Sequence, residues 1–122
     1  MKSRFNENQP IFQQIAEMIE DDILNGTYSE NEQIISVAQF ASTFQINPAT
    51  AVKGIALLVN EGILYKKRGL GMYVAEGARE LIMGKRRTRF FDDLVQKMLD
   101  EAYKLELTSE DIIKMIRQKD GR

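Results

Sequence analysis

Residues 46–53 read Ile46-Asn47-Pro48-Ala49-Thr50-Ala51-Val52-Lys53, and residues 60–74 read NEGILYKKRGLGMYV. The first stretch predicts the abrupt start of a helix, because Asn47 is a favoured N-cap and Pro48 fits the first helical position. The second stretch contains two short β-prone runs, 63–65 and 72–74, separated by a basic link with glycines. This pattern predicts a β-hairpin directly after the helix.

An amphipathic helix is predicted upstream, from about Pro10 to Asn25-Gly26, where glycine favours a helix exit. Its apolar residues recur at helical spacing and predict a buried stripe: Phe12, Ile15, Ala16, Ile19 and Ile23. We expect three acidic residues to lie on the opposite side of this helix: Glu17, Glu20 and Asp21.

A second, short helix is predicted between Ser36 and Gln45. Ser36 is its expected N-cap, with Gln39 as the other half of a capping box. Its apolar stripe is formed by Val37, Phe40, Ala41 and Phe44. In the third helix, after Asn47, the inward stripe is formed by Ala51, Ile55, Leu58 and Val59.

The outward face of the third helix carries small and cationic side chains near its start: Ala49, Thr50 and Lys53. Small side chains let a helix enter the major groove, about 12 Å wide, until base edges are within reach. A helix N-terminus also attracts a phosphate oxygen, and Lys53 is placed to reach a phosphate or a guanine edge. The alternative is that Asn47-Pro48 only forms a turn between two core helices.

The hairpin link carries the cations Lys66, Lys67 and Arg68, followed by Gly69 and Gly71. Glycine allows close approach of a backbone, and a narrow minor groove attracts an inserted arginine. Arg68 is therefore the best candidate for a contact at the hairpin tip, whereas a solvated basic turn is the alternative. The helix pair, turn and hairpin, in this order, predict a winged helix-turn-helix DNA-binding domain over residues 1–77.

Composition narrows the classes of function. The 122 residues are 43% hydrophobic and 29% charged, which is typical of a folded domain, and they include no Cys and no His. Without Cys and His, the chain lacks the ligands of most metal sites, a thiol nucleophile and the commonest general base. We therefore expect neither an enzyme nor a cofactor. No apolar run approaches the roughly 20 residues of a membrane span, and no signal-peptide pattern is present. We expect a cytoplasmic protein without a membrane partner.

Net charge is only −1, but the charges are segregated along the chain. Acidic residues collect early and late, and basic residues gather between Lys53 and Arg68 and again at residues 85–89. Segregated charge predicts one face for an anion such as DNA, although ordinary solvated charge is an alternative. The cluster from Lys85 to Arg89 is compatible with a place near DNA or with a solvated helix face.

The tail, residues 78–122, predicts a long helix from Ala78 to Leu105 and a final helix that starts at Thr108. Its apolar stripe exceeds what a three-helix domain can cover, so a second copy is the expected partner. The predicted interface of this homodimer consists of Phe91, Leu94, Val95, Met98, Leu99 and Ala102. Folding of the stripe onto its own domain is the alternative. The fold class is therefore mainly α with a small β-hairpin, a winged helix-turn-helix followed by a two-helix dimerisation tail.

Residues 9–77 resemble the GntR family of bacterial transcription regulators, from the opening QPIFQQI to the wing GLGMYV. The pattern is most similar to the short YtrA-like branch, in which Asn-Pro-x-Thr starts the recognition helix and two helices replace a large effector domain. Transferred residue by residue, the resemblance implies DNA contacts from the following positions: Ser36, Asn47, Ala49, Thr50, Lys53, Arg68, Gly69 and Gly71.

The chain departs from the family pattern at two positions. Many relatives carry arginine where this sequence has Ala38 and Val52, and each lost phosphate contact lowers the electrostatic part of binding. The run of cations at residues 66–68 can compensate, as can Lys2 or Arg4.

These features together predict a transcriptional regulator, a repressor, that binds a palindromic double-stranded operator as a homodimer. The alternative is a winged-helix protein-interaction module without sequence-specific DNA binding. With about 45 residues after the wing, we expect little room for a deep small-molecule pocket of the usual few hundred Å3. Any unidentified small-molecule effector is expected to bind at the dimer interface or between the tail and the DNA-binding domain.

Overall fold

The computed structural model describes residues 5–120; Lys2 and Arg4, considered above, lie outside the described residues. The chain divides into two compact units, Met1–Met83 and Gly84–Arg122. The described residues are mainly helical, with one two-stranded antiparallel sheet, as predicted. Along the described part of the chain, no helix is both long enough and apolar enough to cross a membrane.

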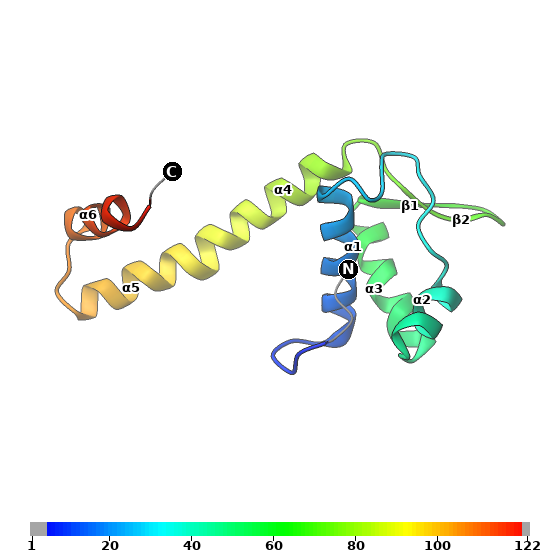
Figure 1. The fold of residues 1–122 in the computed structure, drawn as a ribbon, viewed down its shortest axis with the longest axis horizontal. Coiled ribbons are helices and arrows are strands. Elements are labelled where there is room, and N and C mark those ends of the chain that lie inside the picture. The colour runs from blue at the N-terminus through cyan, green and yellow to red at the C-terminus, as the bar shows by residue number, and fades with distance from the viewer. Residues whose placement is uncertain (1–4, 121–122) are drawn as a thin grey trace. The chain divides into compact units, whose positions relative to one another are not determined.

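The first unit contains three helices, a hairpin and the start of a fourth helix. These elements are α1 (Ile11–Leu24), α2 (Val37–Phe44), α3 (Pro48–Asn60), β1 (Leu64–Lys67), β2 (Gly71–Val74) and α4 (Ala78–Arg89). Figure 1 shows α1 and α3 lying against each other, α2 near the start of α3, and the hairpin following the end of α3. The predicted order of elements is confirmed.

The core of this unit is built from most of the residues in the predicted stripes; Phe12, predicted in the stripe of α1, is only partly buried and is not among the core residues. Ile15, Ile19, Phe40, Ile55 and Leu58 are among its largest buried side chains. Val59, predicted to point inward, is only partly buried at the edge of this core.

The core also includes two residues that follow residue 77, where the sequence predicted the end of the domain. Ala78 and Ile82 of α4 are fully buried within it, which is why the compact unit extends to Met83. The start of α4 therefore belongs structurally with the three-helix unit.

Glu20 corrects an expectation about α1. The sequence placed it on the side of α1 opposite the apolar stripe, but its side chain is fully buried, and Asp22 is buried as well. A buried carboxylate is tolerated only with a polar or charged partner. Glu20 is not without a partner, and no buried side-chain nitrogen or oxygen of the described residues lacks a hydrogen bond. Helical spacing correctly identified the apolar stripe of α1. It did not predict that the elements packed around α1 bury more of its surface than this stripe.

The hairpin is extended by a segment from the loop between α1 and α2. β1 and β2 pair in the register Leu64↔Val74 and Lys67↔Gly71. Gln33 forms an isolated antiparallel bridge with Tyr73, and the Ile34 N–H donates to the Met72 carbonyl at 3.0 Å. The loop is thus fixed against β2, which ties the wing to the chain just before α2.

The second unit is helical. The end of α4 is followed by a π-helical segment, η1 (Phe90–Val95), then by α5 (Gln96–Lys104) and α6 (Ser109–Lys119). The predicted long helix is present from 78 to 104, with a π-helical turn that the apolar spacing did not predict. The predicted start of the last helix is confirmed by a capping box: Thr108 Oγ1 accepts from the Asp111 N–H at 3.1 Å, and the Asp111 carboxylate accepts from the Thr108 N–H at 2.8 Å.

Candidate nucleic-acid interface

The turn between α2 and α3 has the geometry of a helix-turn-helix. Ser36 Oγ caps α2 by accepting from the Gln39 N–H at 3.0 Å. Gln45 ends α2 in the left-handed conformation, with φ of 52°, and the Ile46 N–H donates to the Ala41 carbonyl at 3.0 Å. The chain then reverses within two residues, so the start of α3 follows immediately at Asn47.

Asn47 starts α3 as the sequence predicted. Its Oδ1 accepts from the Ala49 N–H at 2.9 Å, and Pro48 occupies the first helical turn. Asn47 and Ala49 are exposed, and Thr50 is half-buried. The first turn of α3 therefore presents a small, polar surface to solvent at the positive end of the helix dipole.

Lys53 lies one turn further along the same helix and is exposed. Its Nζ lies 4.1 Å from the centre of the Phe12 ring, at the start of α1. A cation above an aromatic face is held there electrostatically, so Phe12 orients the amine that the sequence assigned to a phosphate or guanine contact. Nothing in the spacing of α1 predicted this pairing, because Phe12 was expected only as a core residue.

The cations of the wing do not form one patch. Successive side chains of a strand point to opposite faces, so Lys66, paired with Met72, lies on the face opposite to Lys67, paired with Gly71. Lys67 Nζ lies 4.3 Å from the centre of the Tyr73 ring.

Arg68 lies at the tip of the wing, together with Gly69, within a turn closed by the Leu70 N–H and the Lys67 carbonyl at 3.0 Å. Gly69 has a φ of 76°, which glycine adopts without strain. Arg68 is exposed and is the cation best placed to extend beyond the hairpin.

The two positions that depart from the family pattern face solvent. Ala38 is exposed on α2, and Val52 is exposed on α3. An arginine at either position would therefore point outward and be free to contact a phosphate. The electrostatic contribution of both sites is missing from this surface.

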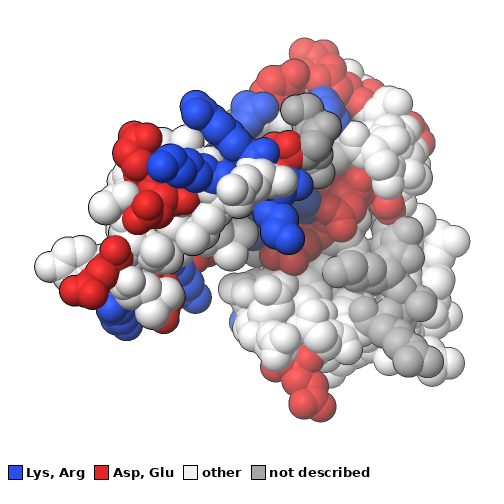
Figure 2. Space-filling model, turned by 60° about the vertical axis from the view of Figure 1, so that its left-hand side comes forward, with Lys and Arg blue, Asp and Glu red and all other residues white. Residues whose placement is uncertain are grey.

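The basic cluster from Lys85 to Arg89 lies on the part of α4 that belongs to the second unit, Gly84–Arg122. Lys85, Arg86 and Arg89 each interact with another group of the protein. Figure 2 shows a face on which basic and acidic side chains lie next to one another. Cations that already have partners favour the solvated-face interpretation of this cluster over a place near DNA.

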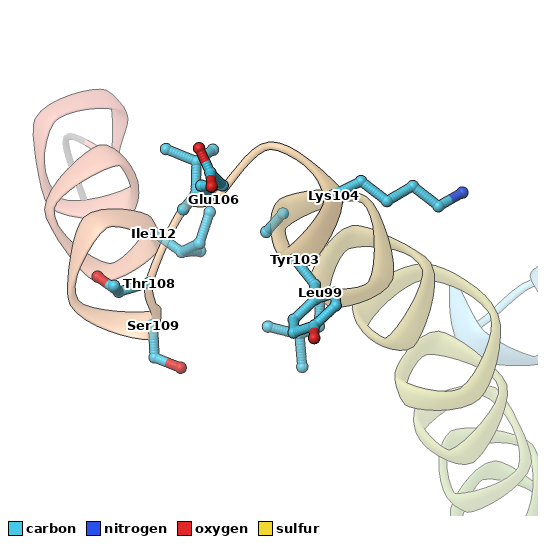
Figure 3. Close-up of a pocket in the computed structure, with 9 residues that line it drawn as sticks. Leu99, Tyr103, Lys104, Glu106, Thr108, Ser109 and Ile112 are labelled. Atoms are coloured by element: carbon cyan, nitrogen blue, oxygen red, sulfur yellow. The ribbon is translucent and has the colours of Figure 1, made fainter.

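The tail contains a hollow of about 900 Å3 between α5 and α6 (Figure 3). Apolar side chains line part of it, among them Leu99 and Ile112, and Lys104 extends away from α6. The turn at residues 105–108 directs α6 back beside α5 and leaves this space between the two helices. The hollow is open to solvent and is not a deep pocket, so the scarcity of room for a deep pocket in the tail stays a prediction.

The predicted site residues on α2, α3 and the wing all belong to the first unit. A capped helix with a small exposed first turn, preceded by a short helix and a tight turn and followed by a basic hairpin, defines a winged helix-turn-helix DNA-binding protein. The sequence missed two contributors, Phe12 beneath Lys53 and Gln33 beside the wing.

Comparison with known proteins identifies the family to which the chain belongs. Residues 11–74 match the family described as bacterial regulatory proteins, gntR family, and the chain belongs to this family. It is 30% identical to the HTH-type transcriptional repressor YtrA of Bacillus subtilis, over 77% of this chain and 72% of that protein.

Solved structures agree with this assignment. A GntR-family transcriptional regulator from Listeria monocytogenes is 27% identical, covers 95% of this chain and 100% of its own, and has a TM-score of 0.76. The DNA-binding domain of AraR, solved in complex with its operator ORX1, is 28% identical, with coverage of 62% and 92% and a TM-score of 0.54. The chain is a DNA-binding transcriptional regulator of the GntR family.

Proposed function

We propose that this protein is a repressor that binds a palindromic operator as a homodimer in the bacterial cytoplasm, where its DNA target lies. The observation that carries this proposal is the exposed, capped first turn of α3 in the same unit as the Arg68 wing tip. The start of α3 would enter the major groove and Arg68 the adjacent minor groove. The repressor activity named for YtrA and the operator complex of AraR support this proposal.

Dimerisation is supported by the apolar residues that the second unit leaves exposed. Phe91, Leu94, Met98 and Leu99 are exposed, and Val95 is half-buried. Ala102 is already buried by its own chain, so the proposed interface depends on the other five predicted residues. A twofold dimer would present two recognition helices to half-sites about one DNA turn, or a multiple of it, apart.

The experiment begins with selection of duplexes from a randomised pool by the full-length protein. Affinity for the selected duplex is then measured by fluorescence anisotropy at several salt concentrations. We expect two related half-sites in the selected sequence and a steep decrease of affinity with salt.

Four variants test which surface reads the DNA. We expect Lys53→Ala and Arg68→Ala to weaken binding about tenfold and to reduce the salt slope by about one unit each. Lys114→Ala and Arg117→Ala, which remove exposed cations of α6, are the matched controls and should leave affinity unchanged. Equal binding by all five proteins would contradict the assignment of the reading surface.

The same experiment decides the alternative of a protein-interaction module. Such a module would select no common sequence and would bind duplexes weakly, without dependence on Lys53 or Arg68. Either result would reject the repressor proposal while leaving the family membership intact.

A further inference from the structure

Gln33, in the loop before α2, holds the tip of the wing. Its backbone pairs with Tyr73, and its side-chain Nε2 donates to the Leu70 carbonyl at 2.5 Å. Its Oε1 accepts from the Tyr73 hydroxyl at 3.4 Å. One exposed amide therefore contacts both the second strand of the wing and the turn that carries Arg68.

Gly71 provides the space for this amide. A Cβ added at Gly71 would lie 2.8 Å from Gln33 Nε2, and the φ of this residue is 121°. Any side chain here would displace the Gln33 amide from the Leu70 carbonyl. The second glycine of the wing thus has a role inside the protein, besides the close approach to DNA that the sequence suggested.

Aromatic contacts also stiffen the hairpin around Tyr73, the strand residue that Gln33 contacts. The Tyr65 and Tyr73 rings are stacked with centres 5.9 Å apart, and the Tyr65 hydroxyl donates to Asn31 Oδ1 at 2.8 Å. With Lys67 above the Tyr73 ring, the Arg68 turn is fixed on both sides, through Lys67 before it and through Leu70 after it.

We propose that Gln33 is a positioning residue for DNA recognition, which sets the conformation of the Arg68 turn and couples it to the start of α2. This inference rests on the proposed function. The coupling is short, because Gln33 precedes the α2 N-cap, Ser36, by only three positions. Fixing the turn before binding removes an ordering cost that a free hairpin tip would bear on entering the groove.

The test uses Gln33→Met in the full chain, because methionine keeps the length and loses both hydrogen bonds. We expect its affinity for the duplex selected by the wild-type protein to decrease about threefold to tenfold, the range of one or two hydrogen bonds. Tyr73→Phe keeps the ring under Lys67 and removes only one of the two hydrogen bonds, so its affinity for this duplex should decrease less than that of Gln33→Met. Gln13→Met, at an exposed position of α1, is the matched control.

The decisive measurement is the double variant Gln33→Met with Arg68→Ala. If Gln33 acts through the turn that carries Arg68, the double variant binds as weakly as Arg68→Ala alone, and the two losses are not additive. The thermal midpoint of Gln33→Met should equal that of Gln13→Met, which separates positioning from loss of fold.

Two results would overturn the inference: wild-type affinity in Gln33→Met, or an equal loss whether or not Arg68 is present. Failure of the proposed function is a different outcome, because the wild-type protein would then select no duplex.

Discussion

Gly54 determines how closely α1 and α3 approach each other. A Cβ at this position would lie 2.8 Å from the Phe12 carbonyl oxygen and 2.9 Å from Ile15 Cγ2. The first contact is with backbone, which cannot move without shifting α1. The helix pair beneath the proposed reading surface therefore requires glycine here, although glycine weakens the interior of a helix.

Gly54→Ala should lower the free energy of unfolding by about 1–3 kcal/mol, the usual cost of overpacking. The matched control is Gly84→Ala in α4, where nothing lies within 4 Å of the added Cβ. That change should raise stability by about 0.4–1 kcal/mol, because alanine loses less backbone entropy. Urea unfolding followed by circular dichroism measures both, and changes of the same sign would contradict the close approach seen at Gly54.

Tyr28 gives the protein a dependence on alkaline pH. Burial raises the pKa of its phenol above the usual value near 10, the more so because Asp22 and Glu32 lie nearby, while the Ile35 N–H that donates to it acts in the opposite direction. The neutral phenol is the form that the folded state favours. Its contribution to stability is therefore present below about pH 10 and is lost as pH rises through the raised pKa.

We expect the stability of Tyr28→Phe to fall less steeply above about pH 10 than that of the wild type. Tyr103→Phe is the control, because Tyr103 is 86% exposed. Urea midpoints measured across the alkaline range compare the three proteins. Parallel curves for Tyr28→Phe and wild type would show that burial of this phenol does not matter.

Helix boundaries were the most predictable feature, because caps are local. The Asn47 side chain accepts from a free N–H in the first turn of α3, and Thr108 and Asp111 form a reciprocal pair at the start of α6. The short sequence around each cap therefore contains the whole interaction. The hairpin was predictable for the same reason, since alternating β-prone residues and a glycine turn are adjacent in sequence.

Contacts between distant segments could not be predicted in this way. Gln33 lies in a polar loop whose pattern does not indicate that it pairs with β2, and Gly54 appears in the sequence as one more small residue of a helix. Glu20 was predicted opposite the apolar stripe of α1, and its burial was not foreseen, because spacing predicts the side of a helix but not which neighbours cover it. The sequence therefore predicted the helix caps and the hairpin turn of the site, which depend on neighbouring residues. It did not predict the distant residues, such as Gln33, that orient them.

The start of α6 provides a test of local capping. Thr108→Ala removes the hydroxyl that accepts from the Asp111 N–H and should destabilise this helix by about 1 kcal/mol, whereas Thr108→Ser keeps the acceptor and should cost much less. Hydrogen exchange of the amides in the first turns of α6 measures the difference. Equal protection in both variants would mean that packing, not the cap, fixes this end.

The π-helical segment concerns the assembly of the whole protein. η1 contains Phe90, Phe91 and Leu94, all more than half exposed. π-helical turns are rare, occur mostly within α-helices and are frequently found at functional sites. A run of apolar side chains at such a turn, uncovered by its own unit, is what a second copy would bury, and this agrees with the homodimer proposed above.

Leu94→Asp should therefore convert the protein from dimer to monomer without unfolding it, because Leu94 is 60% exposed in the single chain. Burial of a leucine contributes roughly 1.5–3 kcal/mol, and the symmetric interface contains each substitution twice. The dimer dissociation constant, measured by sedimentation, should increase at least about a hundredfold.

Ile11→Asp is the matched control, since it exchanges an exposed apolar residue of the first unit for the same acid at a helix start, where a carboxylate is tolerated. It should remain dimeric. With an unchanged reading surface, monomeric Leu94→Asp should bind a single half-site as well as the wild type does, yet lose most of its affinity for the full palindrome, because the two half-sites are then bound independently. A Leu94→Asp protein that sediments as a dimer, or that binds the palindrome with wild-type affinity, would show that η1 does not join two copies and that the symmetry of any operator has another origin.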